Sequence, residues 1–374
     1  MARFWRSLLV AIAACALALG VAACGGDDDG GGSSSAPQQS APANEADVNG
    51  SIDPAKVKTK TMRVAVDNPH YLFQVDALVA QDKGYLKKYG IDSYKGTVTD
   101  NPIQAMIGGS VDMVLFDTDT LMAAARKTGE DIRVVGMYIN QEANILGVRK
   151  GINSPDDLKK IKAKIAVSGR GTRSFVQMEQ MLKENGINPD TDVRLLDTGG
   201  QSNERLQQTL NGTVDGGSVQ LRHETLLKQG GGKFLYKKVF DAPQLAWATT
   251  GDFIKKDPEG VAAFLAATLK ARQDIVDMKN KDYVLDLMEK TGDFELPQSF
   301  KDAYSVENAP DYRGTTGGFE IASMDKLVQE QKDIGVIPKD VDWKKYVDFG
   351  PLWRAQKNLK IELDPAPNEI QTGS

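Results

Sequence analysis

Residues 105–112 read AMIGGSVD, and the end of this stretch recurs as LNGTVD at residues 210–215. In both copies a helical pattern reaches a glycine, turns, and continues as an apolar strand. A glycine suits this position because the end of a helix often needs a residue in the left-handed conformation. The recurrence indicates one structural unit used twice, about a hundred residues apart.

Other features recur with this turn. A short apolar strand at residues 62–66 matches another at residues 164–167, and each is followed by a polar loop and a helical pattern. The strand–helix–strand order predicts parallel strands with helices on both faces. Two such units predict an α/β fold of two lobes, each a mostly parallel sheet flanked by helices. Ligands of open α/β sheets bind beyond the carboxyl ends of the strands, so we expect a ligand cleft between the lobes.

The N-terminus has the pattern of a targeting segment. Arg3 and Arg6 precede an apolar run at residues 8–19 that is too short to span a bilayer, and small residues then lead to Cys24. This order resembles the lipobox of bacterial lipoproteins, which implies a signal peptide of residues 1–23 and lipidation of Cys24. An ordinary signal peptide with a chance cysteine is the alternative. Residues 24–60 are mostly small and polar, so we expect a disordered tether.

The composition argues against several classes of function. The chain has 374 residues, two cysteines, two histidines and a formal net charge of −5. Cys15 lies in the signal segment, so with Cys24 lipidated the folded domain has no thiol for a disulfide, a nucleophile or a metal. His70 and His223 belong to no local metal-ligand pattern, and no basic stripe indicates nucleic acid. We therefore expect no cofactor and no metal.

Five motifs in order carry a family resemblance. They are AQDKGYLKKYGID at 80–92, AMIGGSVD at 105–112, GINSPDDLK at 151–159, FIKKDPE at 253–259 and GVIP at 335–338. Together they resemble the periplasmic binding proteins for sulfonates, nitrate and thiamine pyrimidine precursors. Each motif alone is weak, but the five keep the family's order and spacing over residues 61–355. The turn at residues 160–164, KIKAK, departs from the family pattern.

The resemblance implies the type 2 periplasmic-binding-protein fold. Lobe one would comprise residues 61–146 and 248–361, lobe two residues 147–247, and residues 362–374 a C-terminal tail. It implies a monomer, held outside the cytoplasm by its lipid anchor, that captures a small solute by hinge closure. The partner would be the membrane permease of an ABC importer, and the protein would not be an enzyme.

Loops that leave the strands toward the cleft supply the candidate ligand-binding residues of lobe one. Their carboxylates, hydroxyls and aromatic rings offer hydrogen bonds and stacking, with helix capping as the alternative role for the acidic ones. The candidates in lobe one are Asp67, His70, Tyr71, Asp117, Thr118 and Tyr312.

Lobe two supplies a glycine-containing loop that follows a strand and opens a helix. Backbone N–H groups and the helix N-terminus favour an anion there, and two arginines add charge. A surface loop with solvated arginines is the alternative. The candidates in lobe two are Ser168, Arg170, Gly171, Thr172, Arg173, Gln201, Gln220 and Arg222.

These residues indicate a solute with two different ends. The arginines suit an anionic group, whereas Asp67, Asp117 and the aromatic rings suit a polar or cyclic end. We expect a small organic anion such as a sulfonate or carboxylate, then a thiamine pyrimidine precursor, then nitrate. Two other classes stay open. One is an enzyme like the eukaryotic thiamine-pyrimidine synthases, whose cysteine-rich segment is absent here, and the other is a tethered solute sensor.

Overall fold

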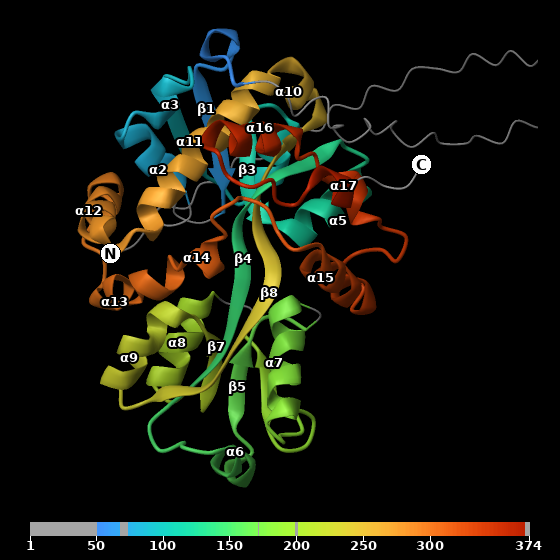
Figure 1. Cartoon of the computed structure of the whole chain (residues 1–374). Helices are drawn as coiled ribbons and strands as arrows, with labels where there is room; N and C mark the ends of the chain where they lie inside the picture. The colour runs from blue at the N-terminus through green and yellow to red at the C-terminus, as the bar shows by residue number, and fades with distance from the viewer. Residues whose placement is uncertain (1–50, 68–73, 171, 199–200, 371–374) are drawn as a thin grey trace, which may run out of the picture. The chain divides into compact units, whose positions relative to one another are not determined.

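One mixed β-sheet runs through the whole folded part of the chain (Figure 1). The computed structural model describes residues 51–67, 74–170, 172–198 and 201–370. In these residues the strand order is β2-β1-β3-β8-β4-β7-β5-β6. The strands are β1 (Thr61–Val66), β2 (Ser93–Val98), β3 (Met113–Asp117), β4 (Ile132–Val148), β5 (Lys164–Val167), β6 (Arg194–Asp197), β7 (Gly216–Val219) and β8 (Lys233–Thr250).

Two long strands join two parallel groups. β1 pairs in parallel with β2 and β3, and β5 pairs in parallel with β6 and β7. Between these groups β4 and β8 pair antiparallel along almost their whole length, with β3 beside β8 and β7 beside β4. Figure 1 shows β4 and β8 side by side, running from the β1–β3 group toward β5. The two predicted α/β lobes are therefore present, and they share one sheet through β4 and β8.

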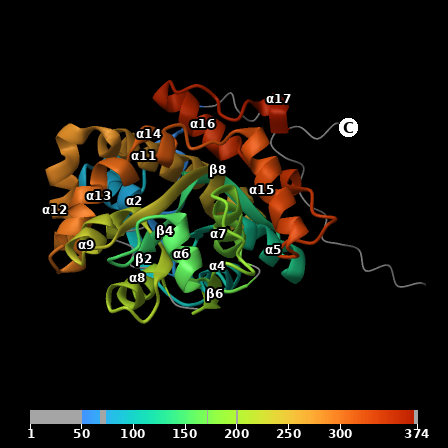
Figure 2. The same ribbon diagram turned by 90° about the horizontal axis from the view of Figure 1, so that it is seen from below.

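Helices flank the sheet on both faces. The two views agree that α8 and α9 lie on one side of the strands of lobe two and α7 on the other (Figure 2). The α-helices are α2 (Val75–Asp82), α3 (Tyr85–Lys88), α4 (Pro102–Ile107), α5 (Thr118–Thr128), α6 (Pro155–Ile161), α7 (Arg173–Glu184), α8 (Ser202–Leu210), α9 (Glu224–Gln229), α10 (Gly251–Lys256), α11 (Pro258–Val276), α12 (Lys281–Gly292), α13 (Gln298–Glu307), α14 (Pro310–Arg313), α15 (Ile321–Asp333), α16 (Gly350–Leu359) and α17 (Pro367–Ile370). Short 3₁₀ turns are η2 (Pro54–Lys56), η3 (Leu221–His223), η4 (Met278–Asn280) and η5 (Trp343–Tyr346). No described helix is long and apolar enough to cross a membrane.

The recurring turn has the same structure in both lobes. Gly109 and Gly212 have φ values of +71° and +77°, in the left-handed region that favours glycine. The aspartate that ends each copy accepts a backbone N–H from the neighbouring strand, at 2.9 Å from Arg63 to Asp112 and 2.8 Å from Lys164 to Asp215. The repeated Val-Asp pair therefore fixes the first strand of each lobe to the turn beside it.

The apolar core of lobe one includes residues outside its predicted boundaries. One apolar cluster fills lobe one, and two smaller clusters fill lobe two. Ile52, Val57 and Ile370 belong to the lobe-one cluster and are 6%, 3% and 1% exposed. Residues 51–60, expected in the tether, and residues 362–370, expected in the tail, therefore pack on the core. The sequence missed these segments because each buries only one or two apolar side chains.

A buried ionic group ties three helices of lobe one together. Asp76 on α2 is fully buried, and its two carboxylate oxygens accept hydrogen bonds from Arg272 Nε at 2.8 Å and Arg313 Nη1 at 3.1 Å. The guanidinium groups lie 5.5 Å and 4.7 Å from the ring centre of Tyr138 on β4. Removing one partner of such a group leaves buried charge uncompensated, which is costly.

We predict that Asp76→Ala lowers the free energy of unfolding by about 3–5 kcal/mol, because two arginines then remain buried without their carboxylate. Denaturant unfolding followed by circular dichroism measures this change. Asp340→Ala is the matched control, since Asp340 forms an exposed pair with Arg126, and a change within about 0.5 kcal/mol is expected. Equal effects of the two substitutions would contradict the prediction.

Candidate ligand-binding cleft

Three adjoining hollows lie between the two lobes, and all three are lined by Gln220 and Gln244. Gln220 directly follows β7 of lobe two, and Gln244 lies in β8, which both lobes share. Because they share these lining residues, the hollows adjoin one another, and together they make up the candidate cleft. We call its parts the polar chamber, the passage and the aromatic chamber, with the passage sharing further lining residues with each of the other two.

The polar chamber encloses about 420 Å³. Its lining residues come from both lobes and are mostly polar: Asp117, Asp119, Thr120, Glu142, Ala143, Asn144, Ser168, Thr172, Ser174, Gln201, Arg205, Ser218, Val219, Gln220, Gln244, Gln331 and Val336. The volume and the number of hydrogen-bonding groups suit a polar organic molecule or part of one.

Local bonds hold the polar side chains in place. Thr172 caps α7 by accepting the N–H of Phe175, and its hydroxyl lies 2.8 Å from that of Ser168. Asn144 donates its amide to the carbonyl of Ser174 at 3.1 Å. The Oδ1 atom of Asn144 is buried and has no hydrogen-bonding partner among the described residues. A buried acceptor left without a donor costs free energy, so a bound molecule that supplies a donor would relieve that cost.

The passage leads from the polar chamber to the aromatic chamber. Asp67 and Asp117, which follow β1 and end β3, lie on the lobe-one side, and Gln201 and Ser202 at the start of α8 lie on the lobe-two side. The carboxyl ends of these parallel strands therefore face the cleft, as expected for open α/β sheets.

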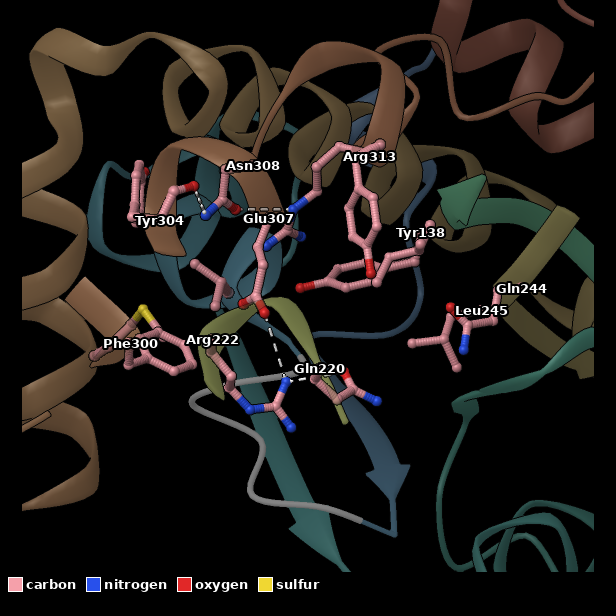
Figure 3. A pocket seen from close by; sticks show the side chains of 14 residues that line it. Tyr138, Gln220, Arg222, Gln244, Leu245, Phe300, Tyr304, Glu307, Asn308 and Arg313 are labelled. Atoms are coloured by element: carbon pink, nitrogen blue, oxygen red, sulfur yellow. Dashed lines mark hydrogen bonds and ion pairs between the residues drawn. The ribbon is translucent and has the colours of Figure 1, made fainter. Parts of the chain in front are cut away.

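The aromatic chamber is smaller, at about 110 Å³. Figure 3 shows Tyr138, Phe300, Tyr304 and Glu307 around it, with Arg222 and Gln220 on the opposite side. The remaining lining residues are Val75, Ile139, Gln244, Leu245, Met288, Asn308, Tyr312 and Arg313.

Glu307 and Arg222 approach each other from opposite lobes. Glu307 ends α13, Arg222 lies in η3, and their Oε1 and Nη1 atoms are 3.7 Å apart. Burial raises the pKa of Glu307 above its usual value, and the nearby Arg222 and Arg313 only partly offset this effect. Burial likewise raises the pKa of Tyr304 and of Tyr312. The chamber thus has an acidic group whose charge is disfavoured.

A neutral histidine positions the lobe-two side of the cleft. His223 is 2% exposed, its Nδ1 accepts the N–H of Gln220 at 3.2 Å, and its Nε2 lies 2.7 Å from Asn203 Oδ1. Burial lowers the pKa of His223 to about 3, with Arg222 and Arg205 adding to the effect. The unprotonated Nδ1 fixes the start of η3, and with it the backbone that carries Gln220 and Arg222.

The structure brings many of the predicted site residues together and leaves some apart. Lining the cleft are Asp67, Asp117, Ser168, Thr172, Gln201, Gln220, Arg222 and Tyr312. Thr118 is buried and donates its hydroxyl to the carbonyl of Gln244, so it supports the cleft without lining it. Arg170 is exposed, with its guanidinium 5.3 Å from the ring centre of Phe175, and does not line it either. His70, Tyr71, Gly171, Cys24 and the side chain of Arg173 lie outside the described residues.

Sequence reasoning missed most of the aromatic chamber. Tyr138 and Gln244 lie inside the long strands β4 and β8, and Glu307 lies at the end of a helix that the sequence pattern did not reveal. Gln244 lies three residues before the predicted boundary between lobe two and the second part of lobe one, at residues 247 and 248, and that proximity was the available signal. Nothing local marks Glu307, because its role depends on α13 reaching η3 of the other lobe.

Within the described residues no group of three or more His, Cys, Asp or Glu side chains is arranged to hold a metal ion. The polar groups that surround the cleft are mainly hydroxyls, amides, single carboxylates and arginines, which include both hydrogen-bond donors and acceptors. Their chemistry suits hydrogen bonding to an organic molecule.

Comparison with known proteins places the chain in a class and then in a family. The putative sulfonate-binding protein SsuA of Methylobacillus flagellatus KT has a similar structure, with a TM-score of 0.62, 17% identity, and coverage of 82% of this chain and 96% of that one. The nitrate-binding protein NrtA of Synechocystis PCC 6803 gives a TM-score of 0.59 at 16% identity, with 83% and 93% covered. The predicted periplasmic-binding-protein fold is confirmed.

The sequence also shows similarity to solute-binding proteins. The nitrate/nitrite binding protein NrtA of Synechocystis sp. (strain ATCC 27184 / PCC 6803 / Kazusa) is 22% identical over 350 residues, covering 79% of this chain and 76% of that protein. The family described as NMT1/THI5 like matches residues 75–280, which is more than half of the chain. The chain belongs to the NMT1/THI5-like family, and the predicted resemblance is confirmed.

We predict that the buried neutral His223 destabilises the fold at acidic pH. Its pKa is lower in the folded than in the unfolded chain, so the unfolded chain binds a proton as pH falls through about 6.5. The free energy of unfolding then decreases toward pH 3, by at most about 1.4 kcal/mol per pH unit from this group. Urea unfolding of the native protein and of His223→Gln at several pH values measures the effect. The variant is expected to have the shallower dependence, and identical slopes would contradict the prediction.

Proposed function

We propose that the protein is an exported solute-binding protein of an ABC importer that captures a small organic molecule between its two lobes. The observation that carries the proposal is the cleft of three adjoining hollows, whose lining residues come from both lobes and include Gln220 and Gln244 in every hollow. A molecule that contacts both walls stabilises the closed arrangement of the lobes, and the closed surface then delivers it to the permease.

The relatives support the transport role. NrtA and SsuA are named as binding proteins, and the SsuA structure is described as part of a sulfonate ABC transporter. In the described part of the cleft the side chains hold one another in hydrogen bonds and ion pairs, and His223 is buried and bonded through both ring nitrogens. This arrangement favours binding over catalysis. A tethered sensor would use the same cleft and differ only in its membrane partner.

The dimensions of the cleft favour an organic solute over nitrate. Two chambers of about 420 and 110 Å³ joined by a passage exceed what a four-atom anion fills. In the glycine-containing loop of lobe two, where we expected an anion, Ser168 and Thr172 line the polar chamber, whereas the guanidinium of Arg170 lies over the ring of Phe175. A sulfonate or carboxylate therefore remains a candidate for the polar chamber, and a thiamine pyrimidine precursor for the cleft as a whole.

If the cleft binds a solute, a ligand should stabilise the protein, and substitution of a cleft residue should weaken the binding of that ligand. A screen of sulfonates, aromatic carboxylates, pyrimidines and nitrate by thermal shift, followed by calorimetric titration, is expected to find a compound that raises the unfolding temperature. Gln220→Ala should weaken its binding about tenfold, because Gln220 lines all three parts of the cleft. Gln329→Ala, on the exposed face of α15, is the control and should bind normally. A ligand that binds both variants equally would place the site elsewhere.

Lipid anchoring is also part of the proposal, on the lipobox-like sequence that ends at Cys24. We predict that cells grown with labelled palmitate incorporate the label into the native protein and not into Cys24→Ser. The variant should also move from the membrane to the soluble fraction. Labelled Cys24→Ser would show that the lipid is attached elsewhere, and an unlabelled native protein would indicate an ordinary signal peptide.

A further inference from the structure

The aromatic chamber has the size and walls of a site for a single ring. Its volume of about 110 Å³ is smaller than that of engineered cavities, about 150 Å³, that take up benzene, but it adjoins the passage, with which it shares Arg222 and Leu245. Tyr138, Phe300 and Tyr304 supply aromatic surface, and Val75 and Met288 supply aliphatic surface. Flat rings gain both apolar burial and edge or face contacts with such walls.

The chamber also presents polar groups that the protein itself does not fully satisfy. The hydroxyl of Tyr138 is buried and has no hydrogen-bonding partner among the described residues. Glu307 and Arg222 form an ion pair across the lobes, with Oε1 and Nη1 3.7 Å apart, and remain 18% and 22% exposed, so a ligand can reach part of each side chain. Arg222 also donates to Gln220 Oε1 at 3.1 Å. Figure 3 shows Glu307 directed toward Arg222, with the Tyr138 hydroxyl beside the same space.

The other polar groups of this wall are committed to the protein. Arg272 bonds Asp76 and the carbonyls of Met137, Arg313 and Gly314. Arg313 bonds Asp76 and Asn308, and Asn308 in turn donates to the carbonyl of Tyr304. Asp76 balances one of the two buried guanidinium charges, and Glu307 lies near the other. Among the polar groups between the aromatic walls, Glu307, Arg222 and the Tyr138 hydroxyl remain available to a ligand, with Gln220, Gln244 and Tyr312 beside them.

We propose that Glu307 and Arg222, one from each lobe, form a charge-selective subsite for an uncharged ring that carries an adjacent hydrogen-bond donor and acceptor, as a carboxamide does. The inference rests on the proposed solute-binding function and specifies one end of the solute. Glu307 accepts the N–H donor, Arg222 donates to the acceptor, and Tyr138 adds a third hydrogen bond. When Glu307 is ionised, a carboxylate or sulfonate in the same place offers it no donor and adds a second negative charge beside it, so the selectivity applies above the raised pKa of Glu307.

The subsite also couples recognition to closure. α13 carries Glu307 and contacts lobe two at a second point, where Thr225 Oγ1 donates to Asp302 Oδ2 at 3.0 Å. Tyr312 on α14 packs against the lobe-two cluster that includes Leu221 and Leu227. The donor of the ligand meets lobe one and its acceptor meets lobe two, so the pair of hydrogen bonds forms only when the lobes come together.

Three single-ring probes test the subsite: benzamide, its isostere benzoate, and benzenesulfonate, each titrated into the purified full-length protein and followed by ligand-detected NMR. The native protein is expected to bind benzamide about tenfold more tightly than either anion. Glu307→Gln should lose most of this preference. The variant should bind benzamide more weakly and benzoate more tightly, because the carboxamide of the new glutamine can donate a hydrogen bond to the carboxylate of benzoate. Tyr138→Phe removes a buried hydroxyl without loss of fold and should weaken benzamide about threefold to tenfold.

Glu224→Gln on the exposed start of α9 is the matched control and should leave all three affinities unchanged. Three results would each overturn the subsite. The first is that the native protein binds benzoate or benzenesulfonate as tightly as benzamide, the second is that Glu307→Gln keeps the full preference for benzamide, and the third is that benzamide does not bind at all. If the solute screen has found a ligand whose binding depends on Gln220, such a result refutes the subsite alone. If the screen finds none as well, the solute-binding function itself fails.

Discussion

The antiparallel pairing of β4 with β8 is the interaction on which the other features depend. It runs from Ile132 opposite Thr250 to Val148 opposite Lys233 and belongs to both lobes. β3 completes its hydrogen bonding on β8 and β7 completes its own on β4, so each parallel group is attached to the same two-stranded ribbon. Bulges interrupt the pairing between Val134 and Gln141, where they increase twist and bending. The cleft lies along this ribbon because both groups of strand ends face it.

The ribbon does not by itself fix the helices that close lobe one. Asp76, shared by Arg272 and Arg313, connects α2, α11 and α14, and Arg272 adds bonds to the backbone of β4 and of the α14 loop. A single carboxylate thus sets the positions of helices that lie far apart in the sequence. Both guanidinium groups lie over the ring of Tyr138, so the same ionic group also holds this wall of the aromatic chamber in place.

The two chambers make different demands on a ligand. The polar chamber is wide and lined by hydroxyl, amide and carboxylate groups, whereas the aromatic chamber is narrow and lined by rings around one carboxylate and one arginine. A solute that fills both must have a polar part and a ring-like part. The nitrate- and sulfonate-binding relatives share the fold, and the residues at the two ends of this cleft would give this chain its own selectivity.

The sequence alone determined the α/β class, the two-lobe architecture and the family, because these follow from local signals. The Val-Asp turns at Asp112 and Asp215, the strand–helix alternation and the five ordered motifs are each readable within a short window. It also identified loops at strand ends, such as those holding Asp117, Ser168 and Gln220. Only the tertiary structure decided that the guanidinium of Arg170 lies over Phe175, that Ile52 and Ile370 are core residues, and that Tyr138, Gln244 and Glu307 line the cleft. These assignments depend on contacts between elements that lie far apart in the sequence. A local pattern of residues does not determine which distant elements come into contact.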